Sequence, residues 1–220
     1  MADRLPAAAT LHMERHVAFV HEHGALRHLP AATTKPGTVT AEGGDLTGPF
    51  DAVLLALPSP QAAPLLAAIA HPFAAAAART VIAPCWAVMA VFDQRLDLPD
   101  TQRPSSGPLG WIARDSARPG HAAGPEAWVL HATADWSRAH LEDGPDSVIE
   151  ALLQAFPASA KPVHVSAHRW RYALVETPLG QSCLWDPAAS IGLCGDWCLG
   201  PRIEAAYDSG VALARAVLAA

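Results

Sequence analysis

Residues 50–58 constrain the fold of this chain more than any other segment, because they form an apolar run that ends at a proline. The run reads FDAVLLALP, and its apolar side chains follow one another without the alternation of a half-exposed strand. Such a strand is typical of a parallel sheet with helices on both of its faces. The sequence therefore predicts an α/β fold built around this strand.

A helix is expected directly after this strand. Ser59 and Pro60 are a favourable cap and a favourable first-turn residue, and the apolar sequence continues to residue 70. Pro64 is expected to shift the start of the helix downstream, because a proline inside a helix removes one backbone hydrogen bond. A second short helix is expected at residues 72–79.

The sequence before residue 50 predicts short strands separated by turns. Residues 16–20 and 38–40 are the strand candidates, and glycine-containing turns flank the second of them. We expect a hairpin or a meander in this region.

Residues 84–174 follow a different pattern, in which strands and helices alternate with long connections. Strands are expected at 86–92, 109–113, 127–132 and 163–172, and helices at 135–141 and 146–156. Val148, Leu152 and Phe156 recur at four-residue steps and predict an apolar helix face. This arrangement is typical of an antiparallel sheet backed by helices.

The last of these strands carries aromatic and basic side chains that alternation divides between two faces. His168, Trp170 and Tyr172 fall on one face, whereas Arg169 and Arg171 fall on the other. The two sets are therefore not expected to line the same pocket.

The C-terminal part returns to a strand, a turn and a helix. Residues 191–196 predict a short strand that ends in Gly195 and Asp196, and a turn at 200–201 leads into a final helix. A carboxylate in this place can accept hydrogen bonds from sugar hydroxyls, and the unpaired N–H groups of a helix start attract negative charge. This order of elements favours a phosphorylated cofactor. The final helix has an apolar face formed by residues 203, 207, 211, 214 and 218.

Charge and hydropathy exclude several classes of partner. The chain has 15 Lys and Arg against 21 Asp and Glu, and it contains no basic block, so we expect no nucleic acid and no anionic membrane surface as partner. The longest apolar stretches, such as residues 62–70, are too short to cross a bilayer, and no secretory signal follows Met1. We expect a soluble, cytoplasmic protein, and no sequence feature specifies an oligomeric state.

No metal site is expected. The histidines at positions 12, 16, 21, 23 and 28 are not matched by a second cluster of ligands, and the 4 cysteines fit no zinc spacing. We expect the cysteines to be buried and reduced, and the alternative is a redox pair between Cys194 and Cys198.

Residues 195–210 resemble the C-terminal cofactor motif of the flavin-containing amine oxidase superfamily, and in particular its bacterial renalase-like branch. The resemblance extends over residues 45–220, and further similar segments are 50–61, 83–89, 109–115, 128–132 and 168–173. It implies FAD as the cofactor and a mixed α/β (α+β) fold. Residues 1–80 and 181–220 would form a partial, Rossmann-like FAD-binding domain, and residues 81–180 an inserted substrate domain with an antiparallel sheet and helices.

The resemblance also assigns cofactor-binding residues. Asp196 would bind the ribityl chain, and Gly195 would allow the backbone to approach the cofactor closely. The backbone of Arg202, Ile203 and Glu204 would face the flavin pyrimidine edge. The remaining positions are Leu57 and Pro58, at the end of the strand beside the cofactor, and Val17, whose main chain would lie by the adenine.

One part of the family pattern has no counterpart here. The family has a strand, a G-x-G-x-x-G turn and a helix near its N-terminus, which bind the pyrophosphate. The glycines at 37, 43, 44 and 48 lie in polar turns and do not match this motif. We therefore expect the chain to bind FAD weakly by itself.

The resemblance implies hydride transfer from a small-molecule substrate, an amine or a dihydronicotinamide-like compound, to FAD, with oxygen as the electron acceptor. Trp197, Trp170 and Tyr172 are the candidate catalytic residues, as aromatic walls of the substrate pocket together with Trp111. The alternative for each is packing in a domain core. Two further alternatives concern the whole chain: a truncated binding module that does not hold FAD, or a natural protein whose start lies upstream of Met1.

Overall fold

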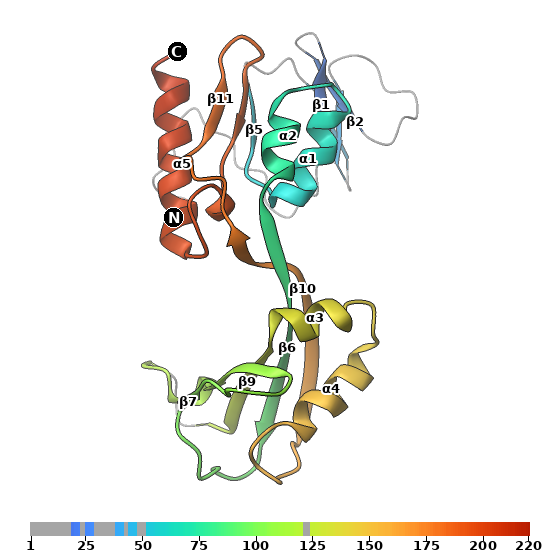
Figure 1. The fold of residues 1–220 in the computed structure, drawn as a ribbon, viewed down its shortest axis with the longest axis vertical. Coiled ribbons are helices and arrows are strands. Elements are labelled where there is room, and N and C mark those ends of the chain that lie inside the picture. The colour runs from blue at the N-terminus through green and yellow to red at the C-terminus, as the bar shows by residue number, and fades with distance from the viewer. Residues whose placement is uncertain (1–18, 23–24, 29–37, 42–43, 48–51, 121–123) are drawn as a thin grey trace. The chain divides into compact units, whose positions relative to one another are not determined.

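The computed structural model describes residues 19–22, 25–28, 38–41, 44–47, 52–120 and 124–220. The chain falls into two compact units: unit 1 comprises Met1–Thr80 and Pro178–Ala220, and unit 2 comprises Val81–Thr177 (Figure 1). None of the helices within these described ranges is long and apolar enough to cross a membrane.

The sheet of unit 1 contains a parallel pair of strands, which agrees with the parallel sheet that residues 50–58 predict. Strand β5 (Val53–Leu55) pairs in parallel with β12 (Ile191–Leu193), and β11 (Leu184–Asp186) pairs with β12 in the antiparallel direction. Val53 and Leu55 are buried, but Leu54 between them is 48% exposed. The predicted strand is therefore confirmed, and its expected burial on both faces is wrong for the residues that the structure describes.

Two short helices, α1 (Ser59–Ala67) and α2 (Phe73–Ala78), follow β5. The expected downstream start is wrong, because α1 begins at Ser59 and continues through Pro64. Burial of Ala62 and Leu66 explains this result, since their packing outweighs one lost backbone hydrogen bond. Ser59 does not cap the helix through its side chain, because its buried hydroxyl instead accepts a hydrogen bond from Thr80 Oγ1.

The final helix, α5 (Ile203–Leu218), packs through a face other than its apolar one. Its buried residues are Ala205, Ser209 and Leu213, whereas Ile203 and Leu218 are each 88% exposed. A Cβ atom on Gly192 of β12 would lie 2.6 Å from Leu213 Cδ1, so the glycine provides the space that this helix occupies. Close approach to a glycine in the sheet thus decides which face of α5 is buried.

Four short strands belong to the N-terminal part of unit 1. Strand β1 (Phe19–Glu22) pairs with β2 (Ala25–His28), and β3 (Thr38–Ala41) pairs with β4 (Gly44–Thr47), both in the antiparallel direction. The strand predicted at 38–40 is confirmed. Of the strand predicted at 16–20, only residues 19 and 20 lie within the described residues.

Unit 2 is the predicted antiparallel sheet backed by helices. The strands lie in the order β10-β6-β9-β8-β7, and all neighbouring pairs are antiparallel. Their bounds are Val81–Phe92 for β6, Thr101–Gln102 for β7, Leu109–Arg114 for β8, Glu126–Ala132 for β9 and His164–Thr177 for β10. All four predicted strands are present, and β6 and β10 are longer than expected.

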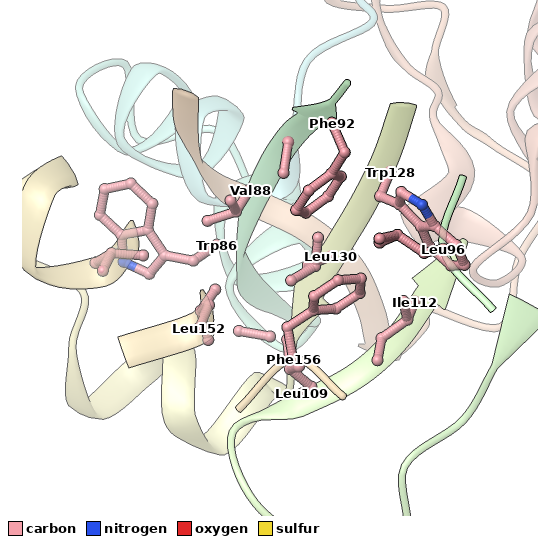
Figure 2. Close-up of a cluster of buried hydrophobic side chains, with 13 residues drawn as sticks. Trp86, Val88, Phe92, Leu96, Leu109, Ile112, Trp128, Leu130, Leu152 and Phe156 are labelled. Carbon is pink, nitrogen blue, oxygen red and sulfur yellow. The ribbon is translucent and has the colours of Figure 1, made fainter. Parts of the chain in front are cut away.

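The core of unit 2 lies on one face of this sheet (Figure 2). Helix α4 (Pro145–Gln154) buries Val148 and Leu152, and Phe156 just beyond it stacks on Phe92 with ring centroids 5.8 Å apart. Helix α3 (Ala134–Ala139) is capped by Thr133, whose hydroxyl accepts a hydrogen bond from the Trp136 N–H. The predicted apolar face of residues 148, 152 and 156 is therefore confirmed.

A buried ion pair connects the loop after β6 to the sheet. The Arg114 guanidinium bonds the Glu126 carboxylate, donates to Asp100 Oδ1 at 2.7 Å and lies 4.5 Å from the centre of the Trp128 ring. It also donates to the carbonyl oxygens of Leu96 and Leu98 at 3.0 and 2.6 Å. The buried charge is thus surrounded by acceptors, as a buried guanidinium requires.

Candidate functional site

The parallel pairing of β5 and β12 brings two separate segments of the chain to one edge of the sheet. Leu57 and Pro58 follow β5, and Gly195 and Asp196 follow β12. Two hydrogen bonds connect the segments: Cys194 N–H donates to Leu55 O at 3.2 Å, and Trp197 Nε1 donates to Leu57 O at 2.9 Å. Ligands of α/β proteins bind outside the carboxyl ends of such strands.

The turn after β12 orients the carboxylate of Asp196. Asp196 Oδ1 accepts a hydrogen bond from the Trp197 N–H at 2.8 Å, and the Asp196 carbonyl accepts from the N–H groups of Leu199 and Gly200 at 2.9 and 2.7 Å. The residue is half-buried, and its Oδ2 has no hydrogen bond to any described part of the chain. One carboxylate oxygen therefore remains available to a hydroxyl donor.

Gly195 is required by the packing of its own turn. A Cβ atom at this position would lie 2.5 Å from Trp197 Nε1 and 2.6 Å from Trp197 Cδ1. The Gly195 N–H donates to the buried Ser209 hydroxyl of α5 at 3.0 Å, which ties the turn to the final helix. The glycine is thus explained without a ligand, although it also leaves the backbone uncovered by a side chain.

Trp197 lies in the core of unit 1. Its side chain is fully buried, and its indole N–H is bonded to Leu57 O. The Trp197 carbonyl accepts a hydrogen bond from the Leu179 N–H at 2.9 Å, so the residue also fixes the segment that precedes β11. This burial differs from the sequence expectation of an aromatic wall that faces a substrate.

The start of α5 is exposed at all three of the positions expected to face a cofactor. Arg202, Ile203 and Glu204 are exposed, and no side chain caps the first turn. The first N–H groups of a helix have no partner within it, so they can attract an anion or a partially negative oxygen. Val17, expected by the adenine, lies outside the described residues.

The cysteines near this turn are free thiols. Cys194 and Cys198 are both buried without a disulfide. Burial raises the pKa of both thiols, that of Cys198 to about 11, so they are protonated at neutral pH. The expected burial is thus confirmed for Cys194 and Cys198, whereas Cys85 and Cys183 are only half-buried. Across the described ranges, no three His, Cys, Asp or Glu side chains form a group that could hold a metal ion.

Unit 2 contains a partly open cavity of about 580 Å³ that is lined by residues of β6, β8, β9 and β10. Trp111 of β8 and Trp170 and Tyr172 of β10 form its aromatic walls. The other lining residues are Pro84, Cys85, Gly110, His131, Ala132, Ala134, Ala173 and Leu174. Two of the three candidate catalytic residues, Trp170 and Tyr172, therefore share this cavity.

The two arginines of β10 lie away from this cavity. Arg169 Nη1 bonds Glu142 Oε2 at 2.9 Å, and Arg171 Nη1 bonds Glu142 Oε1 at 2.8 Å. The prediction that the aromatic and basic residues of this strand do not share a pocket is confirmed. His168 is outside the lining set and makes an edge contact with Trp170, with ring centroids 4.3 Å apart.

Burial disfavours the charged forms of two side chains that line the cavity, His131 and Cys85. Burial lowers the pKa of His131, and burial raises the pKa of the Cys85 thiol. Neither residue is predicted from the sequence as part of a site. His131 lies directly opposite Trp111 in the pairing of β9 with β8. Alternation orders the side chains within each strand, but only the register of the two strands makes these residues neighbours.

Comparison with known proteins gives the family of the chain. A family model described as flavin-containing amine oxidoreductase matches residues 9–218. This match confirms the predicted resemblance to the flavin-containing amine oxidase superfamily and the cofactor class that it implies, a flavin, and the structure confirms the mixed α/β fold.

Solved structures share the fold at low sequence identity. A protein of Exiguobacterium sp. 255-15, named as a putative protoporphyrinogen oxidase, has a TM-score of 0.67 and 17% identity, over 92% of this chain and 46% of its own. Cyclohexylamine oxidase from Brevibacterium oxydans IH-35A has a TM-score of 0.56 and 14% identity, over 91% of this chain and 47% of its own.

A putrescine oxidase variant has a TM-score of 0.59 and 14% identity, over 94% of this chain and 49% of its own. The chain thus spans less than half the length of these three structures. With the family model matching nearly its whole length, the chain belongs to the flavin-containing amine oxidoreductase family.

Proposed function

We propose that this chain acts in a flavin-dependent oxidoreductase of the amine oxidase and renalase type, in which unit 1 binds FAD and unit 2 binds the substrate. The observation that carries the proposal is the parallel pairing of β5 and β12. It brings Leu57 and Pro58 to the same sheet edge as Gly195 and Asp196. A crevice outside the carboxyl ends of parallel strands is the usual place of a dinucleotide.

The residues at this edge have the chemistry that FAD requires. The unbonded Oδ2 of Asp196 accepts a hydrogen bond from a ribityl hydroxyl, and Gly195 presents bare backbone. The N–H groups of Ile203 and Glu204 at the start of α5 would hold the pyrimidine edge of a bound flavin, because a helix N-terminus favours negative charge. The assignment of the Val17 main chain to the adenine rests on the family resemblance alone.

The substrate binds in the cavity of unit 2. Bound FAD would supply a hydride acceptor for an amine or a dihydronicotinamide-like compound, with oxygen as the final electron acceptor. Trp170, Tyr172 and Trp111 orient the substrate by contact with its flat surface, and neutral His131 offers it one hydrogen bond. We assign Trp197 a structural role instead, because its buried indole N–H joins the two segments of the sheet edge that is proposed to bind FAD, residues 57–58 and 195–196. We call this edge the cofactor edge.

The first test is an absorbance spectrum of the purified chain, taken before and after incubation with FAD and desalting. Flavin bands that survive desalting would support the proposal. Asp196→Ala should then lower the retained flavin at least tenfold without unfolding unit 1, because a hydrogen bond to a charged group contributes about 1.5–3 kcal/mol. Asp97→Ala, at an exposed position of unit 2, is the matched control and should retain flavin fully. Equal retention by both variants would exclude Asp196 as a ligand.

A second candidate function is a binding module that does not hold FAD by itself. The observation in its favour is the exposure of apolar side chains on the elements of the cofactor edge: Leu54 is 48% exposed and Ile203 88% exposed. Exposed apolar groups on paired elements mark surfaces where other polypeptide packs. A chain that remains colourless after incubation with saturating FAD would favour this candidate over the first.

A further inference from the structure

The walls of the unit 2 cavity carry no charge. None of its lining residues is acidic, and none is lysine or arginine. Its aromatic surface comes from Trp111, Trp170 and Tyr172, of which Trp170 is 54% exposed and Tyr172 39% exposed. Flat, partly exposed aromatic surfaces are suited to stacking against another planar ring.

A positive charge lies against one of these walls from outside the cavity. The Arg103 guanidinium carbon is 4.7 Å from the centre of the Trp111 ring, which is the geometry of a cation–π contact. Arg103 is exposed, and no carboxylate in the described part of the chain pairs with it. The Trp111 ring is therefore already engaged by one cation and is less attractive to a second.

The acidic groups nearest to the lining residues in sequence are already paired. Asp135 follows Ala134, and its Oδ1 lies 2.7 Å from Arg138 Nη1. Glu176 lies two residues beyond Leu174, and its carboxylate bonds the Nη2 of the same Arg138. Neither of these residues lines the cavity, so a cation bound there would lose water without a carboxylate among the lining residues to replace it.

We propose that this cavity accepts an uncharged planar ring and discriminates against a protonated amine, and that Arg103 is the residue that sets this preference. The inference rests on the proposed function, because it takes the cavity as the substrate site. An amine substrate would then enter in its unprotonated form. Arg103 is a specificity-determining residue here and has no part in the chemical step.

The test compares two probes with the same ring, benzamide and benzylamine, whose binding to the full chain is measured by calorimetry at neutral pH without FAD. Benzamide should bind at least about threefold more tightly, which is the size of one exposed cation–ring interaction. Arg103→Gln should reduce the ratio of the benzamide affinity to the benzylamine affinity about threefold. Arg103→Lys keeps the positive charge and should therefore keep most of this ratio. Arg95→Gln removes another exposed charge of unit 2, one that has no ion-pair partner among the described residues, so the ratio of the two affinities should not change.

Three results would each overturn the proposal: tighter binding of benzylamine, equal ratios in Arg103→Gln and Arg95→Gln, or benzamide binding that survives Trp170→Ala. Because the assay contains no flavin, it separates this proposal from the proposed function. A chain that discriminates the probes but never retains FAD contradicts the proposed function alone. A chain that retains FAD but prefers benzylamine contradicts the ring preference alone.

Discussion

Trp197 Nε1 donates a hydrogen bond to Leu57 O at 2.9 Å, across 140 residues of sequence. The bond joins the turn after β12 to the segment after β5, which are the two segments of the proposed cofactor edge. The indole that makes this bond is fully buried, and Leu57 is half-buried.

Replacing this tryptophan by phenylalanine should destabilise unit 1. Trp197→Phe removes the donor and leaves Leu57 O unpaired, at a cost of about 1–3 kcal/mol in the free energy of unfolding. Urea denaturation measures this cost. Trp185→Phe is the matched control, because the buried Trp185 Nε1 has no hydrogen-bond partner in the part of the chain that the structure describes, and its removal should cost less. A larger cost at Trp185 would contradict the importance of the bond.

Gly195→Ala should also destabilise the turn, because the new Cβ would lie 2.5 Å from Trp197 Nε1. Overpacking of this kind costs about 1–3 kcal/mol. The comparison is Gly210→Ala within α5, where a Cβ has no neighbour within 4 Å. That change should stabilise the chain by about 0.5–1 kcal/mol, since alanine favours helices over glycine. Thermal unfolding of both variants measures the difference in sign.

Removing the buried carboxylate of the Arg114–Glu126 ion pair should lower the free energy of unfolding of unit 2 strongly. Glu126→Ala leaves Arg114 buried without its buried carboxylate and should cost about 3–5 kcal/mol. Asp100→Asn alters the second carboxylate that bonds Arg114. Because the Asp100 side chain is 58% exposed, this change should cost about 1 kcal/mol or less. Similar costs for the two variants in urea unfolding would show that burial does not govern this pair.

Stability should fall in acid through Asp186. Hydrogen bonds from the Ala189 and Ala188 N–H groups and from His71 lower the pKa of the Asp186 carboxyl group. A lowered pKa in the folded state stabilises the fold above the unfolded value, and this contribution is lost as pH falls below about 4.

Asp186→Asn keeps an acceptor for the turn but cannot titrate. The free energy of unfolding of this variant, measured in urea from pH 7 to pH 3, should therefore decline less steeply than that of the wild-type chain. Parallel declines would assign the acid sensitivity to other carboxyl groups.

Local sequence signals were sufficient for most elements of the fold. Alternation and apolar runs predicted the four long strands of unit 2, and the four-residue spacing of Val148, Leu152 and Phe156 predicted its covering helix. These signals work because side-chain period is a property of each element alone. The same holds for the separation of Trp170 from Arg169 on β10.

Tertiary packing decided what local signals left open. It selected the face of α5 that is buried, because Gly192 makes room for Leu213 while Ile203 stays exposed. It allowed α1 to run through Pro64, and it placed Trp197 in a core instead of on a pocket wall.

The strand that ends in Gly195 and Asp196, the turn after it and the final helix could be identified from the sequence, because these elements are continuous in the chain. The meeting of Leu57 with Trp197 and of His131 with Trp111 could not. Those contacts depend on which strands pair and in which register, and burial of distant side chains sets both.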